Sequence, residues 1–114
     1  MTTIIEIAAA DFNRKVLQSP FPVMVDFFSD HCGPCRLLEP ILEDVVSELN
    51  GKMAVYMLNV LDNADLVDQL GIAALPTVSV FDRGTEVARL VGLQNKERLL
   101  EAVQSVAWPM NPSP

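Results

Sequence analysis

The two cysteines of this chain stand three positions apart, in Cys32-Gly33-Pro34-Cys35. They follow a short apolar run, residues 23–28, and begin a long stretch of helical periodicity, so they lie where a strand passes into a helix. Thiols at this spacing can approach closely enough to form a small-ring disulfide, and the free N–H groups of the helix favour negative charge on the first sulfur. Pro34 suits the first helical turn, where its missing N–H is not needed, and with Gly33 it stiffens the cluster. The pattern predicts a reversible dithiol/disulfide couple.

A metal site is the alternative interpretation of a cysteine pair. Cys32, Cys35 and His31 are all the sulfur and imidazole ligands in the chain. They are fewer than the four of a structural zinc site, unless a carboxylate or a second chain contributes. Covalent c-type haem attachment needs a histidine where Arg36 stands. We therefore expect neither a metal nor a bound cofactor.

Asp26 is the next candidate for chemistry, because it is a carboxylate inside the apolar run 23–28. If this strand is central in a parallel sheet, Asp26 is buried on either face, and burial raises the pKa of an acid. Such a group can take or give a proton near neutral pH. On an edge strand the same side chain would be solvated.

Size and charge narrow the class of protein. The chain has 114 residues, half of them apolar, which suits one domain with its own core. Its formal net charge of −7 disfavours nucleic acid and anionic lipid as partners. No run approaches the roughly 20 apolar residues of a membrane span, and no cationic segment precedes an apolar one at the start. We expect a soluble cytoplasmic monomer, where free thiols can cycle.

Strand and helix periods alternate along the chain. Asn63 and Asn95 are the expected N-caps of the last two helices, and Asn50-Gly51 and Gly71 are expected stops. The order β-α-β-α-β-α-β-β-α predicts an α/β fold with a parallel core, helices on both faces and a closing antiparallel hairpin, five strands and four helices in all. The helix at residues 63–70 is expected to complete a second crossover between parallel strands. The expected strands are 4–7, 23–28, 53–60, 77–81 and 86–91, and the expected helices are 10–17, the segment after the cysteines as far as residue 50, 63–70 and the segment after residue 95.

Several separated motifs follow one another along the chain. They are Val25-Asp26-Phe27-Phe28, Cys32-Gly33-Pro34-Cys35-Arg36, Pro40, Leu75-Pro76-Thr77 and Val91-Gly92. In this order the motifs resemble the thioredoxin family. The resemblance covers roughly residues 3–107, and we take residues 1–107 as one thioredoxin domain, with 108–114 as a loose tail. It implies the thioredoxin fold and a protein-disulfide reductase of cell redox homeostasis.

The two cysteines then take different roles. Cys32 is the first thiol, nearest the helix N-terminus and an exposed loop, so we expect it to be the nucleophile. Cys35 lies one turn inside the helix and resolves the mixed disulfide. The resemblance further implies that Asp26 lies beneath the cysteines and exchanges a proton with Cys35.

The resemblance also implies a client-binding rim. It makes the Leu75-Pro76 bond cis and facing the cysteines, with the Leu75 backbone free to pair with an extended client segment. Gly92 and Ile72 complete this rim. Without the resemblance, Pro76 would be an ordinary trans proline at the first residue of a strand.

Three positions depart from the family pattern. His31 and Phe28 stand where thioredoxins usually have tryptophan. Protonated His31 would favour the thiolate of Cys32, with Asp30 able to hold that charge, and the alternative is an exposed histidine without influence. Met57 replaces a common lysine, which should raise the pKa of the buried aspartate further unless another cation such as Lys52 or Arg36 lies nearby.

Two functional classes follow. The first is a reductase of disulfides in client proteins, recharged by a thioredoxin reductase that draws electrons from NADPH or ferredoxin. The second is a non-catalytic interaction module of the same fold, or a redox sensor whose disulfide gates binding. An oxidant is disfavoured because Gly-Pro between the cysteines resembles the reducing branch of the superfamily.

Overall fold

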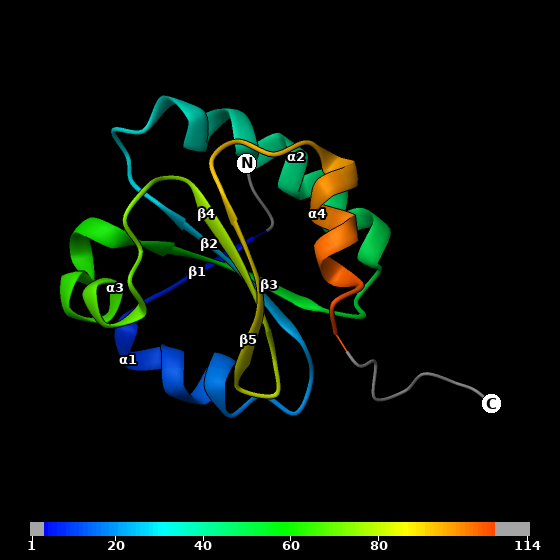
Figure 1. Cartoon of the computed structure of the whole chain (residues 1–114), viewed down its shortest axis with the longest axis horizontal. Helices are drawn as coiled ribbons and strands as arrows, with labels where there is room; N and C mark the ends of the chain where they lie inside the picture. Colours follow the sequence, from blue (N-terminus) through cyan, green and yellow to red (C-terminus); the bar gives the residue numbers. More distant parts are fainter. Residues whose placement is uncertain (1–3, 107–114) are drawn as a thin grey trace.

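A computed structural model describes residues 4–106, and its elements follow one another in the predicted order (Figure 1). The first helix passes from α to π geometry at Asn13, whereas the sequence predicts one continuous helix there. The predicted tail lies outside the described residues, so the domain boundary after residue 107 stays a prediction. The strands are β1 (Ile5–Ile7), β2 (Val23–Phe28), β3 (Ala54–Asn59), β4 (Thr77–Asp82) and β5 (Thr85–Val91). The helices are α1 (Ala9–Phe12), η1 (Asn13–Leu17), α2 (Gly33–Leu49), η2 (Val60–Asp62), α3 (Ala64–Leu70) and α4 (Lys96–Val103).

The five strands form one mixed sheet in the order β1-β3-β2-β4-β5. β3 pairs in parallel with both β1 and β2, whereas β4 runs antiparallel to β2 and forms the predicted hairpin with β5. The prediction that α3 is a second crossover is therefore wrong. A helix of seven residues rises only about 10 Å, roughly half the length of a six-residue strand, so it cannot return the chain along the sheet. The thioredoxin-type mixed sheet with four helices is confirmed.

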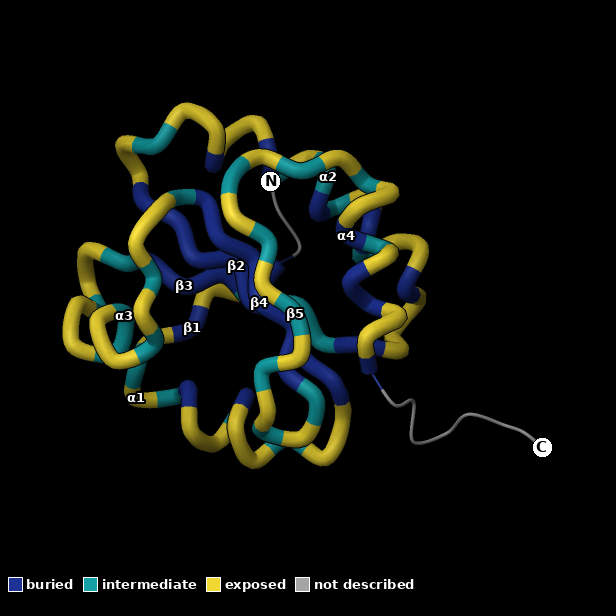
Figure 2. Tube along the Cα trace, in the orientation of Figure 1, coloured by how far each residue is buried: buried dark blue, intermediate teal, exposed yellow. Residues whose placement is uncertain are grey.

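The central strand β2 is buried along its whole length (Figure 2). Its side chains alternate between the two faces of the sheet, as in any strand. Met24 and Phe28 belong to the apolar cluster under α2 and α4, whereas Val25 and Phe27 belong to the cluster on the side of α1 and α3. Because Asp26 lies between Val25 and Phe27, its side chain faces the α2 and α4 layer.

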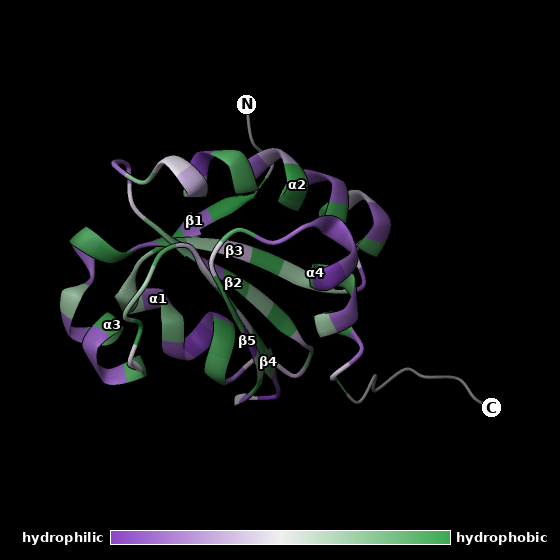
Figure 3. Ribbon diagram, turned by 45° about the horizontal axis from the view of Figure 1, so that its top comes forward, coloured by the Kyte–Doolittle hydropathy of each residue, from purple (hydrophilic) through white to green (hydrophobic). Residues whose placement is uncertain are grey.

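The long helix α2 is amphipathic, and Figure 3 shows bands of apolar and polar residues along it. Leu38, Leu42 and Val45 are fully buried against the sheet at helical spacing. The helix ends at Asn50, which adopts the left-handed conformation at φ 49°, as its sequence predicts. Within residues 4–106, no helix has the length and apolar character that crossing a membrane requires.

Candidate active site

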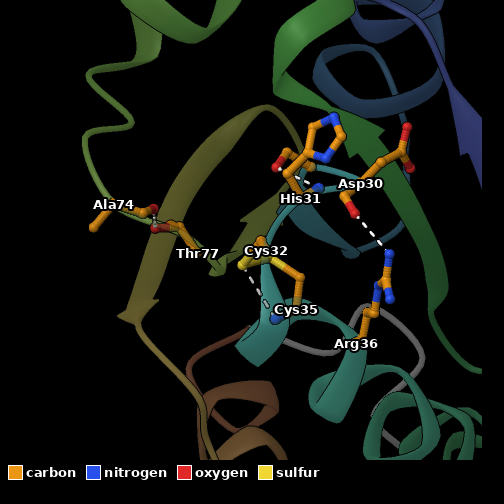
Figure 4. Close-up of a disulfide and its surroundings, with 8 residues drawn as sticks. Asp30, His31, Cys32, Cys35, Arg36, Ala74 and Thr77 are labelled. Atoms are coloured by element: carbon orange, nitrogen blue, oxygen red, sulfur yellow. Dashed lines mark hydrogen bonds between the residues drawn. A yellow bond between two sulfur atoms is a disulfide. The ribbon is translucent and has the colours of Figure 1, made fainter.

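The two cysteines are joined in a disulfide at the N-terminus of α2 (Figure 4). Their Cα atoms lie 5.2 Å apart. Cys32 is the N-cap of the helix, and its Sγ accepts a hydrogen bond of 3.2 Å from the Cys35 backbone N–H. Pro34 occupies the first turn, as predicted. A negative charge on the first sulfur would therefore be stabilised by a helix N–H as well as by the end of the helix dipole.

The two sulfur-bearing residues differ in exposure. Cys32 is half-buried, whereas Cys35 is only 4% exposed and packs within the cluster under α2. The buried residues of β2 lead directly into this junction, and Gly33 and Pro34 are exposed beside it. A disulfide or thiol partner from solvent therefore reaches the first sulfur more readily than the second.

Asp26 is fully buried, with 0% of its surface exposed. On β2 it stands opposite Met57 of β3 and Val78 of β4, which are both buried apolar residues. Within residues 4–106, neither of its carboxylate oxygens has a hydrogen-bond partner. Burial, followed by the negative charge of Glu39, raises the pKa of Asp26 from an ordinary value of 3.8 to about 7. The alternative of a solvated edge-strand aspartate is wrong.

The prediction that Asp26 lacks the usual cationic partner is consistent with its surroundings. Met57 is 8% exposed and lies beside it. A nearby cation would lower the pKa of Asp26, and neither Lys52 nor Arg36 is among the groups that shift it. The Arg36 guanidinium instead donates to the Asp30 carbonyl oxygen at 3.0 Å. The sequence interpretation missed the second carboxylate, Glu39, although its position one helical turn after Cys35 was an available signal.

In the loop before the disulfide, the side chains of Asp30 and His31 have different surroundings. His31 is exposed, its backbone N–H donates to Ser29 Oγ at 3.3 Å, and its ring points away from the disulfide in Figure 4. The Asp30 carboxylate accepts from Asn59 Nδ2 at 3.5 Å. Among the described residues no ion pair joins Asp30 to His31. The influence of His31 on Cys32 therefore stays a prediction.

The segment that leads into β4 contains the expected cis bond, between Leu75 and Pro76. The Pro76 carbonyl oxygen accepts a 2.7 Å hydrogen bond from the N–H of Gly92, which has a φ of 90°. Leu75 is half-buried and contacts both apolar clusters, and Ile72 packs against the one on the α1 and α3 side.

Four of the predicted rim residues are thus placed, and hydrogen bonds hold the rim at two points. Besides the bond between Gly92 and Pro76, Thr77 Oγ1 donates to the Ala74 carbonyl oxygen at 2.7 Å. Figure 4 includes Ala74 and Thr77 among the surroundings of the disulfide. The site therefore combines a sulfur pair whose first member is reachable from solvent, a protonatable buried carboxylate and a backbone edge near the disulfide.

A mixed five-stranded sheet with a disulfide-forming cysteine pair at a helix N-terminus defines a thiol-disulfide oxidoreductase with the thioredoxin fold. The sequence model of the family described as Thioredoxin matches residues 3–105, and the chain belongs to the thioredoxin family.

Individual relatives agree with this assignment. The thioredoxin of Rickettsia felis is 38% identical over 92 residues, which are 81% of this chain and 88% of the relative. Thioredoxin 1 of a Nostoc species is 32% identical over 104 residues, 91% of this chain and 97% of the relative. The bifunctional thioredoxin reductase/thioredoxin of Mycobacterium leprae is 36% identical over 107 residues, 94% of this chain and 23% of the relative.

Proposed function

We propose that this oxidoreductase reduces disulfides in client proteins, with Cys32 as the attacking thiol and Cys35 as the resolving thiol. The observation that carries the proposal is the difference between the two sulfurs. Cys32 is reachable from solvent and accepts a helix N–H, whereas Cys35 is 4% exposed. Because the thiolate is the nucleophile, the sulfur whose negative charge is better stabilised attacks first.

The reaction proceeds by two exchanges. The Cys32 thiolate attacks one sulfur of the client disulfide, a mixed disulfide forms, and the first client sulfur leaves as a thiolate. The Cys35 thiol then loses its proton and attacks Cys32, which releases the second client thiolate and forms the disulfide seen in the structure. The client gains two electrons and the cysteine pair loses two.

Asp26 is proposed to take the proton of Cys35. Its carboxylate is buried on the face of β2 that α2 covers, in the same layer as Cys35. With a pKa raised to about 7 by burial, Asp26 is protonated in acid and accepts a proton only as the pH approaches and passes neutrality. The resolving step should therefore accelerate as the pH rises through that range.

The residues around the pair are proposed to shape client binding. The Leu75 backbone would pair with an extended client strand, beside Pro76, Gly92 and Ile72. Support comes from the hydrogen bond between Gly92 and Pro76, which holds two distant segments of this rim together.

His31, Asp30, Gly33 and Pro34 are proposed to modulate the reactivity of Cys32. Gly33 and Pro34 do so by stiffening the turn, and protonated His31 does so by favouring the thiolate. If His31 acts in this way, alkylation of Cys32 by iodoacetamide will depend on pH differently in His31→Trp. An identical pH dependence would remove His31 from the proposal.

A reductase linked to NADPH or ferredoxin is proposed as the electron donor. The name of the Mycobacterium leprae relative joins a thioredoxin reductase to a thioredoxin in one protein, which supports this pairing. We further propose that the chain acts as a monomer in the cytoplasm, where reducing conditions let the pair cycle.

Catalytic turnover tests the proposal. With dithiothreitol as reductant and insulin as substrate, the protein should reduce many equivalents of disulfide, and Cys32→Ser should abolish this turnover. Cys35→Ser should instead accumulate a mixed disulfide with the client, visible by mass spectrometry. Stoichiometric binding without turnover would favour the interaction module or sensor, and turnover by Cys32→Ser would refute the assignment of the nucleophile.

A further inference from the structure

The surroundings of Asp26 are unusually poor in charge compensation. Across the sheet, the residues level with it on the same face are Glu6, Met57, Val78 and Leu90. Three of these are apolar, and the fourth is an exposed carboxylate on the edge strand β1, two strands away. This row therefore contains no positive group, and Glu6 is not among the causes of the raised pKa of Asp26.

The helices above this row carry the cations Arg36, Lys96 and Arg98, but none of the three is among the causes of the shifted pKa of Asp26. From α4, the buried residues of the same cluster are Leu99, Ala102 and Val103, all apolar. On α2, Cys35 and Glu39 lie on one face, a turn apart. The helix also carries Arg36, Glu43, Asp44 and Glu48, none of which is among the causes of the raised pKa of Asp26. Among the described residues, no cation contributes to the raised pKa of Asp26, and Glu39 is the one charge that does.

Glu39 lies on the face of α2 that carries Cys35, and its charge acts on Asp26. It follows Cys35 by four positions, so the two side chains lie on the same face of α2, one turn apart. On that face Cys35, Leu38 and Leu42 are buried, and Glu39 is half-buried at its border. A carboxylate in this position keeps contact with water and remains within electrostatic range of a fully buried one.

We propose that Glu39 is a positioning residue for the resolving step: its negative charge opposes ionisation of Asp26 and thereby sets the pH range in which Asp26 can take the proton of the Cys35 thiol. The inference rests on the proposed role of Asp26. Where the family commonly has a lysine, this chain has Met57, and Glu39 acts in the opposite sense to such a cation. Compared with the same chain without the charge of Glu39, the resolving step therefore needs a higher pH.

The resolving step combines a proton transfer with a sulfur exchange, and Glu39 affects the proton transfer. One proton passes from Cys35 Sγ to Asp26, the Cys35 thiolate forms a bond to Cys32 Sγ, and the bond from Cys32 to the client sulfur breaks. The client sulfur leaves with the electron pair. Only the proton transfer requires ionised Asp26, so removing the charge of Glu39 should change the resolving step and leave the attack by Cys32 unchanged.

Three variants on α2 and two readouts test this. Glu39→Gln removes the charge, Glu39→Asp keeps it, and Asp44→Asn removes a charge from an exposed position of the same helix as the matched control. The first readout is the ¹³C carboxyl chemical shift of Asp26 against pH in the oxidised protein. The second is the release of thionitrobenzoate when the reduced protein meets one equivalent of 5,5′-dithiobis(2-nitrobenzoate), where the first phase reports attack and the second reports resolution.

We expect Glu39→Gln to move the midpoint of both profiles to lower pH. The second phase at pH 6 should become about threefold faster, which corresponds to a shift of about half a pH unit. Glu39→Asp should restore most of the original profile, and Asp44→Asn should match the unaltered protein. The first phase should be the same in all variants.

The outcomes separate this inference from the proposed function. If Asp26→Asn changes the second phase but Glu39→Gln moves neither profile, the role of Glu39 is wrong and that of Asp26 stands. An equal shift in Glu39→Gln and Asp44→Asn would mean a general charge effect and would also overturn it. If Asp26→Asn itself leaves the second phase and its pH dependence unchanged, the proton transfer to Asp26 fails, and the inference fails with it.

Discussion

The buried carboxylate of Asp26 makes the stability of the protein depend on pH in a direction opposite to that of a salt-bridged aspartate. Its pKa is raised to about 7 in the folded chain, from an ordinary 3.8. The folded state therefore holds a proton that the unfolded state has released, and stability is lost as the pH rises from about 4 through 7. The separation of the two values corresponds to on the order of 4 kcal/mol above pH 8.

Asp26→Asn, which stays neutral, isolates this effect. Its free energy of unfolding in urea, relative to that of the unaltered protein, should increase by several kcal/mol between pH 4 and pH 8, because only the unaltered protein loses stability there. Both proteins are compared with the disulfide intact. A difference that is constant across this range would show that Asp26 is not the buried titrating group.

At the residue scale, the sequence identifies groups whose chemistry is local. The cysteine pair and the buried aspartate follow from residue type, spacing and an apolar neighbourhood, and each lies where that pattern predicts. The spacing from Cys35 places Glu39 on the same helix face, but it does not assign an effect of Glu39 on Asp26. Whether a carboxylate at the border of a helix face acts on Asp26 depends on how α2 sits over β2, and that depends on contacts between distant residues.

At the scale of elements, two asparagines at predicted caps behave differently. Asn95 Oδ1 accepts the Arg98 backbone N–H at 2.9 Å, which confirms it as the N-cap of α4. Asn63 occupies the N-cap position of α3 but makes no capping bond with its side chain. That side chain accepts from the Ala9 N–H at 2.7 Å and donates to the Asn59 carbonyl oxygen at 2.8 Å. A tertiary contact has replaced the local one, which the sequence does not reveal.

The turn between β4 and β5 has no room for an added methyl group at Gly84. Gly84 has a φ of 90°, and a Cβ there would lie 2.6 Å from the Leu17 carbonyl oxygen. Gly51 has a similar φ of 81° with no atom within 4 Å of its Cβ position, so it is the matched control. Gly51→Ala should cost roughly 1 kcal/mol from the left-handed backbone alone. Gly84→Ala should cost clearly more, about 3 kcal/mol, because the hairpin must also move away from η1.

Urea unfolding followed by circular dichroism measures both variants. Equal destabilisation would mean that the hairpin moves away from Leu17 at little cost. A larger loss in Gly51→Ala than in Gly84→Ala would contradict the assigned contact.

At the scale of the whole molecule, strand count and helix order follow from the sequence, but the direction of β4 does not. The alternating strand and helix pattern favours a parallel return after residues 63–70. A helix as short as α3 instead leaves the chain at the end of the sheet where β3 stops, so β4 runs antiparallel to β2. β3 already occupies one side of β2, and β4 pairs with the other side from the opposite direction. That direction places Pro76 and Gly92, before β4 and after β5, at the edge where β2 ends and the cysteines begin.

Net charge is the property of the whole molecule that should select among clients. The chain has a formal net charge of −7 and measures 45 × 26 × 23 Å along its principal axes. At about 10 mM salt, where the Debye length is roughly 30 Å, most of its charged groups therefore contribute to the potential at the disulfide. Reduced protein should then react several-fold faster with cystamine, a dication, than with 3,3′-dithiodipropionate, a dianion. At about 1 M salt, screening shortens this range to roughly 3 Å, and the ratio of the two rates should approach the ratio that the same reagents show with a small thiol.

Stopped-flow measurements at pH 8 give the ratio of the two rates, with the uncharged 2-hydroxyethyl disulfide as the salt-independent control. A preference that survives 1 M salt would instead have to come from charges close to the sulfurs, such as Asp30 and Arg36.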